Sequence, residues 1–118
     1  MRYDDDEAHR MVVRMRELVR EATEQLSGGS THAPCAAADE AIVVATGLDP
    51  AVVPRLSAEA LATVMVMHDQ DERVLELLAQ ALEIEALIST RAGDISKASL
   101  RMEQAQAMRG LLDPERAN

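Results

Sequence analysis

The segment from about residue 70 to residue 92 has apolar side chains around most of its circumference when it is drawn as an α-helix. With an advance of about 100° per residue, one narrow polar stripe collects Glu72, Glu76, Gln80, Glu83 and Thr90. The remaining circumference carries Val74, Leu75, Leu77, Leu78, Ala81, Leu82, Ile84 and Ile88. A helix with so wide an apolar arc must be covered from more than one side. The sequence therefore predicts a central helix with other helices packed around it.

A second helix is expected at about 95–112, and the Gly93-Asp94 pair separates the two helices. Glycine readily adopts the left-handed backbone conformation in which helices end, so this pair predicts a short turn. The two helices then form an antiparallel hairpin over residues 70–112. We expect the inward face of the last helix to contain Ile95, Ala98, Met102, Ala105 and Leu112.

Residues 4–26 predict a long amphipathic helix. Asp4 and Glu7 stand three residues apart, as in a capping box at the start of a helix. Apolar residues recur at spacings of three and four, at Ala8, Met11, Met15, Leu18 and Ala22. Two interpretations fit this stripe. Either the helix packs only on its own domain, or Met11, Met15 and Leu18 pair with another subunit, because the same spacing occurs along a short coiled-coil seam.

Short helices are expected between residues 34 and 68. Pro34 suits the first position of a helix, which the pattern extends to Gly47. Asp49-Pro50 predicts one further turn, and Ser57 is a typical N-cap for a helix at about 57–68. The chain has one tyrosine, no phenylalanine and no tryptophan, and it lacks the alternating apolar runs typical of strands. The expected fold is a single all-α domain over residues 1–118, a small bundle of about five helices.

The balance of charge excludes several classes of partner. The chain has 21 acidic and 12 basic residues and a formal net charge of −9. Binding to nucleic acid or to an anionic membrane surface requires a basic patch, so we expect neither. The start MRYDDDEAHR lacks the basic and then apolar regions of a secretory signal, so we expect none, and no apolar run approaches the length of a membrane span. The expected location is the cytoplasm, and the single cysteine excludes an internal disulfide.

Residues with the chemistry of a metal site or a catalytic site are few. His32 and Cys35 have a spacing that zinc accepts, but a zinc site needs three or four protein ligands, and only His9 and His68 remain. We therefore expect no metal, no cofactor and no enzymatic activity. Cys35 has two interpretations. It is a small buried side chain, or a reactive thiol whose pKa is lowered by the nearby helix N-terminus.

Glu85 interrupts the apolar arc of the central helix. A carboxylate buried there without a partner costs several kcal/mol or becomes neutral, so it needs a cation, a hydrogen-bond donor or water. Arg101 and Arg14 are the expected cations. Arg109 is the corresponding exception on the last helix, but the hairpin register places it about opposite Leu78. Glu85 is therefore either a paired or water-exposed residue at the edge of a groove, or, with Arg109, part of a recognition groove or subunit interface.

Part of the hairpin resembles a single tetratricopeptide repeat. Gly93-Asp94 stands at the turn, and Ala98, Met102 and Ala105 follow at the spacing of that family, although Glu85 stands where the family prefers leucine. The wider chain, with TGLDPAVVPRLSAEAL between the first helix and the hairpin, resembles a family of small bacterial helical proteins with no established activity. Both resemblances imply a helical fold. A single repeat does not imply a peptide-binding groove, because solenoids need about three repeats.

These features favour a non-enzymatic module for protein–protein interaction or oligomerisation. Methionine-rich faces adapt to varied partners, and the candidate interface residues are Met11, Met15, Leu18, Glu85 and Arg109. We expect a homodimer, and the identity of any other protein partner is not specified by these patterns. The alternative function is a thiol- or ligand-responsive sensor domain centred on Cys35.

Overall fold

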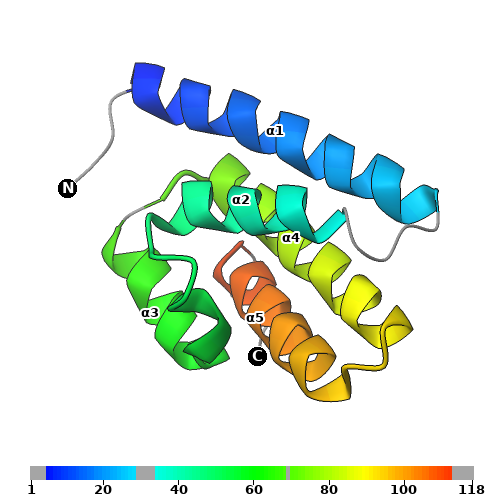
Figure 1. The fold of residues 1–118 in the computed structure, drawn as a ribbon. Helices are drawn as coiled ribbons and strands as arrows, with labels where there is room; N and C mark the ends of the chain where they lie inside the picture. Colours follow the sequence, from blue (N-terminus) through cyan, green and yellow to red (C-terminus); the bar gives the residue numbers. More distant parts are fainter. Residues whose placement is uncertain (1–4, 29–33, 69, 113–118) are drawn as a thin grey trace.

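The computed structural model describes residues 5–28, 34–68 and 70–112, which form an all-α fold (Figure 1). Its elements, in chain order, are α1 (Asp5–Ser27), α2 (Pro34–Thr46), the 3-10 turn η1 (Val53–Arg55), α3 (Ala58–Met67), α4 (Glu72–Arg91) and α5 (Ile95–Leu112). No strand occurs within the described ranges. The expected all-α bundle of about five helices is confirmed.

Helix α4 occupies the middle of the bundle. It packs against α1 and α2 on one side and against α5 on the other, and α3 packs on the outer side of α5 (Figure 1). All eight large or small apolar residues predicted for its buried arc are buried, and so are Ala79 and Ala86. The prediction of a central helix covered from more than one side is therefore confirmed.

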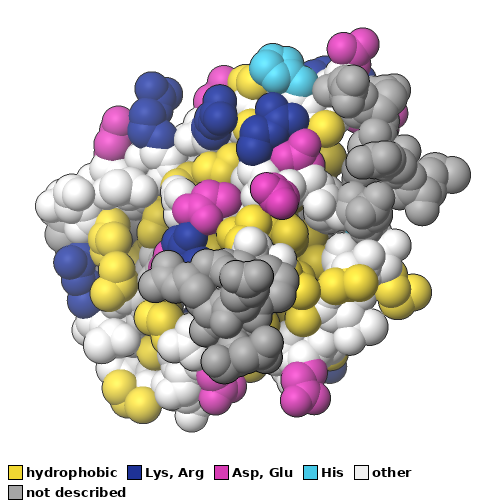
Figure 2. Space-filling model, turned by 180° about the vertical axis from the view of Figure 1, so that it is seen from behind, with side chains coloured by type: hydrophobic (Ala, Val, Ile, Leu, Met, Phe, Trp, Pro, Cys, Tyr) yellow, Lys and Arg dark blue, Asp and Glu magenta, His cyan; other side chains and the backbone are white. Residues whose placement is uncertain are grey.

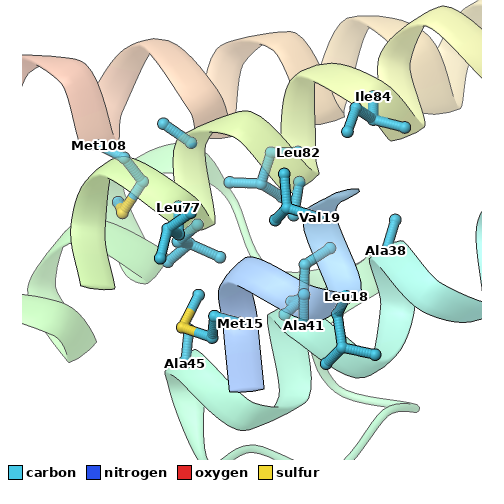
Figure 3. Packing of buried hydrophobic residues seen from close by; sticks show 14 of the residues in the cluster. Met15, Leu18, Val19, Ala38, Ala41, Ala45, Leu77, Leu82, Ile84 and Met108 are labelled. Atoms are coloured by element: carbon cyan, nitrogen blue, oxygen red, sulfur yellow. The ribbon is translucent and has the colours of Figure 1, made fainter. Parts of the chain in front are cut away.

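The core lies where α1 and α2 meet α4, and Figure 3 shows side chains from these helices and from α5 in it. Helix α2 contributes Ala38, Ala41 and Ala45, each 0% exposed. Such small side chains allow neighbouring helices to approach closely, so larger residues of α1 and α4 fill the space between them. This close approach compensates for the lack of aromatic side chains among the described core residues.

The helix ends follow the local chemistry of the sequence. Ser57 Oγ accepts a hydrogen bond from Ala60 N at 3.1 Å, so Ser57 is the N-cap of α3, as predicted. At the hairpin turn, Gly93 has a φ of +82°. Asp94 N donates to Ser89 O at 2.9 Å and Gly93 N donates to Thr90 O at 3.1 Å, which is the Schellman pattern that ends a helix.

The buried face of α5 differs from the predicted one. Of the predicted inward residues, Ile95 is 63% exposed and Met102 is 37% exposed. The fully buried positions of this helix are Arg101, Gln104, Ala105 and Met108. The prediction for Ile95 and Met102 is wrong because α5 is rotated so that two polar side chains face inward, where each finds a polar partner.

Within the part of the chain that the structure describes, no helix has both the length and the apolar character needed to cross a membrane.

Candidate functional site

A buried polar network links the hairpin to the loop that contains η1. Glu85 Oε1 accepts a hydrogen bond of 2.6 Å from Arg101 Nε, and the two side chains are 0% and 3% exposed. Arg101 Nη1 donates to Gln104 Oε1 at 2.7 Å. Gln104 Nε2 donates to the backbone oxygens of Leu56 at 2.9 Å and Val53 at 3.3 Å. The network thus joins α4, α5 and the 53–56 segment through buried side chains.

The antiparallel hairpin brings these residues together. Arg101 follows Glu85 by 16 residues, which places it across the turn on the facing helix. Gln104 lies three residues beyond Arg101, about one helical turn, and therefore on the same face of α5. Of the two cations expected to pair with Glu85, Arg101 is the partner. Arg14 instead pairs with Glu40 at 2.9 Å and with Glu17 at 3.6 Å on the surface of the bundle.

The second oxygen of Glu85 has different surroundings. Oε2 is buried and receives no hydrogen bond from a described residue. The carboxyl group of Asp39, which lies on the wetter side of α2, is its close neighbour. Two ionised carboxylates only accept hydrogen bonds, so this contact becomes favourable when Glu85 carries a proton and donates it toward Asp39.

Burial, and after it the adjacent Asp39 carboxyl, raise the pKa of Glu85 to about 8 against the opposing attraction of Arg101. Glu85 is therefore the neutral acid of the network at neutral pH. In this form Oε1 accepts from Arg101 while the proton on Oε2 bridges to Asp39. The arrangement allows the site to hold and release one proton near physiological pH.

A small cavity adjoins the network between α2 and α5. Its volume is about 120 Å³. Ile42, Val43 and Val53 form part of an apolar wall, and Asp39, Lys97 and Arg101 supply charged groups. The cavity therefore combines an apolar wall with charges of both signs.

Arg109 belongs to a separate, surface cluster. Its guanidinium donates to Glu76 Oε2 at 2.5 Å and to Glu83 Oε1 at 2.8 Å, and the three side chains are 40%, 43% and 37% exposed. These contacts raise the pKa of Arg109, Glu83 first and Glu76 second. The Arg109 hydrogen bond, followed by one from Gln80, lowers the pKa of Glu76. Glu85 and Arg109, which the sequence marked as two exceptions, thus do not meet.

The predicted interface residues of the first helix contribute to the interior. Met15 is 0% exposed and Leu18 is 2% exposed, both within the core shared with α2 and α4, and Met11 is partly buried against it. Met15 and Leu18 therefore present no surface to a second subunit, and the coiled-coil interpretation of this stripe does not fit the structure. Burial within the domain's own core explains the spacing instead.

The remaining candidates are partly outside the described residues. Cys35 is the second residue of α2, but its side chain, like His32, is not among the described parts, so its reactivity stays a prediction. Among the described residues, no group of three or more histidine, cysteine, aspartate or glutamate side chains is arranged to hold a metal ion.

Sequence reasoning missed Asp39, Lys97 and Gln104. Asp39 lies on the exposed side of α2, and no spacing in the sequence relates it to Glu85. Gln104 had one available signal, because it lies one turn from Arg101, on the face that must approach Glu85. A buried arginine needs more than one acceptor for its five N–H groups, so a glutamine at that spacing is a natural second partner.

Comparisons of the chain with protein-family models, with curated proteins and with solved structures give no significant match. The function is therefore inferred from the geometry of its own residues.

Proposed function

We propose that this chain is a non-enzymatic interaction module that forms a homodimer through one face of the α4–α5 hairpin. The observation that carries the proposal is the exposure of large apolar side chains there. Leu87 is 50% exposed, Ile95 is 63% exposed and Met102 is 37% exposed. We call these three residues the hairpin face.

The three residues lie on one side of the hairpin by helical spacing. Leu87 follows Glu83 by one turn on α4, and Met102 precedes Arg109 by two turns on α5. Because Arg109 and Glu83 are joined at 2.8 Å, Leu87 and Met102 are on the same side as that ion pair. Ile95 precedes Met102 by two further turns. Burial of these side chains against another protein would stabilise the complex by about 25 cal/mol for each Å² of apolar surface covered.

Charge along the same face supports a second copy of this chain as the partner. On α4, the Glu76–Glu83–Arg109 cluster, with two acids and one base, lies before Leu87, and Arg91, whose Nη1 donates to Leu26 O at 3.0 Å, lies one turn after it, so a net acidic end and a basic end flank the apolar centre. A twofold axis near Leu87 places the acidic end of one copy against the basic end of the other. The surface is therefore complementary to itself.

Figure 2 shows how charged and hydrophobic side chains are distributed over the rear face of the molecule. Acidic and basic side chains gather along its upper edge, where α1 lies, and hydrophobic side chains appear in separate groups below them. The exposed face of α1 is thus largely charged, which supports the choice of the hairpin over α1 as the contact surface.

Molar mass in solution, measured by light scattering at several concentrations, tests the proposal. The intact chain of 12.8 kDa is expected to approach twice that mass as its concentration rises. Leu87→Glu combined with Met102→Glu is expected to remain monomeric, because the dimer would bury two unpaired carboxylates from each copy.

The matched control is Val66→Glu, a change at a 61% exposed apolar residue of α3. It is expected to dimerise as the intact chain does. A monomeric mass for the intact chain at every concentration would refute the proposal. Equal loss of dimer in the Val66 variant would also refute it, because the effect would then reflect added negative charge and not the hairpin face.

A further inference from the structure

The cavity between α2 and α5 contains hydrogen-bond donors that no described residue uses. Arg101 uses Nε for Glu85 and Nη1 for Gln104. Its Nη2 group donates to no described residue, although the side chain is 3% exposed and lines the cavity. Nη2 is open to the cavity, where water or a bound ligand can accept its hydrogen bond.

A second donor lies on the same wall. Lys97 lines the cavity one turn before Arg101 on α5, and its ammonium forms no ion pair with a described residue. Its backbone nitrogen is occupied by Asp94 Oδ1 at 3.1 Å, but this bond does not involve the ammonium. Two cationic groups one helical turn apart can hold the two oxygens of one carboxylate.

The charges around the cavity also favour an anion. Asp39 is negative, whereas Lys97 and Arg101 are positive. With a proton on Glu85, the group that pairs with Arg101 is neutral, so one positive charge is left without compensation. A monoanion that binds there would neutralise the site.

We propose that this cavity binds a small aliphatic carboxylate, which Lys97 and Arg101 hold by its oxygens. The apolar wall of Ile42, Val43 and Val53 contacts the hydrocarbon part of the ligand. An apolar cavity of about 150 Å³ accommodates benzene, so a volume of about 120 Å³ accommodates a molecule of propionate size. The site is independent of the hairpin face, and its failure would leave the proposed self-association unaffected.

Two kinds of small molecule can supply this carboxylate, and Asp39 would interact differently with each of them. A simple short-chain acid offers only the carboxylate. A small α-amino acid adds an ammonium group that Asp39 at the cavity edge can accept. Propionate and alanine represent the two sources, and propionamide has the size of propionate without its charge.

Titration of the isotope-labelled intact chain, followed by amide NMR, tests the proposal with these three probes. Propionate or alanine is expected to produce saturable shifts limited to the residues of α2, the 50–54 loop and α5 that border the cavity. Propionamide is expected to produce none. Tighter binding of alanine than of propionate would identify the amino acid as the source, and the reverse order would identify the simple acid.

Lys97→Met removes the lysine ammonium without altering a hydrogen bond of the fold, and it is expected to weaken binding roughly tenfold. Arg20→Met, which removes one cation from the exposed side of α1, is the matched control and is expected to leave the affinity unchanged. Shifts that do not saturate, that are scattered over the surface, or that propionamide reproduces would overturn the proposal. So would an equal loss of affinity in both variants.

Discussion

Replacing Glu85 by glutamine imitates the protonated carboxylic acid with little change of shape. The amide oxygen can still accept the hydrogen bond that Arg101 Nε donates, and the amide nitrogen can donate toward Asp39. In the native chain, burial and Asp39 raise the pKa of Glu85 from its ordinary 4.5 to about 8. The glutamine variant keeps the neutral form at every pH.

The sign of the pH effect follows from this difference. Between about pH 4.5 and pH 8, the folded state keeps the Glu85 proton that the unfolded state has lost. The free energy of unfolding therefore falls as the pH rises through this window. The slope is about 1.4 kcal/mol per pH unit, so Glu85 alone removes about 2 to 3 kcal/mol between pH 5.5 and pH 7.5. The stability advantage of the variant over the native chain is therefore expected to grow by that amount between pH 5.5 and pH 7.5, and the two proteins are expected to match only below about pH 4.5.

Urea denaturation followed by far-ultraviolet circular dichroism at pH 5.5, 6.5 and 7.5 measures this difference. The three histidines are present in both proteins, so any contribution from them cancels in the comparison. Glu83→Gln is the control, because Glu83 forms a half-exposed ion pair with Arg109 and its loss costs at most about 1 kcal/mol at each pH. If Glu85→Gln is less stable than the native chain at pH 7.5 and shows the same pH slope, Glu85 is an ionised partner of Arg101, and the reasoning fails.

Two further predictions concern the fold itself. Leu82→Ala is expected to lower the free energy of unfolding by about 2 to 5 kcal/mol, because Leu82 is 0% exposed at the centre of the bundle. The same denaturation assay should find a loss below about 1 kcal/mol for Leu87→Ala, at a half-exposed position of the same helix, and equal losses would contradict the assigned faces of α4. Gly93→Ala is expected to cost about 1 kcal/mol, since φ is +82° while no atom lies within 4 Å of the added Cβ. Gly28→Ala, where φ is not positive, should cost nothing, and a neutral Gly93 variant would show that the turn does not require the left-handed conformation.

The positions of the helices and the buried face of α4 could be predicted from the sequence alone. Its apolar arc is so wide that only one narrow stripe remains for solvent, which leaves little freedom in the choice of buried face. The turn at Gly93 and the cap at Ser57 depend on local chemistry, which is encoded within a few residues. These features do not require knowledge of which helices are neighbours.

The buried face of α5 was harder to predict because the apolar residues of this helix do not define one face. Ile95, Met102 and Leu112 suggest one orientation, whereas Ala105 and Met108 are compatible with another. Helical periodicity depends only on the positions of the apolar residues. It does not indicate that a buried arginine has its hydrogen-bond acceptor on a different helix. The need of Glu85 for a cation was readable from the sequence, but the consequence for the rotation of α5 was not.

That rotation connects the two surfaces to which function is assigned. Turning α5 so that Arg101 and Gln104 face inward places Ile95 and Met102 outward, since these pairs lie on different sides of the helix. A bundle optimised only for apolar burial would have hidden the two apolar residues and exposed the two polar ones. Buried polar groups of this kind often add little net stability. The buried polar groups have a functional explanation if Arg101 binds a ligand in the cavity and the outward apolar residues mediate self-association. A single orientation of α5 then provides both the binding site and the contact surface.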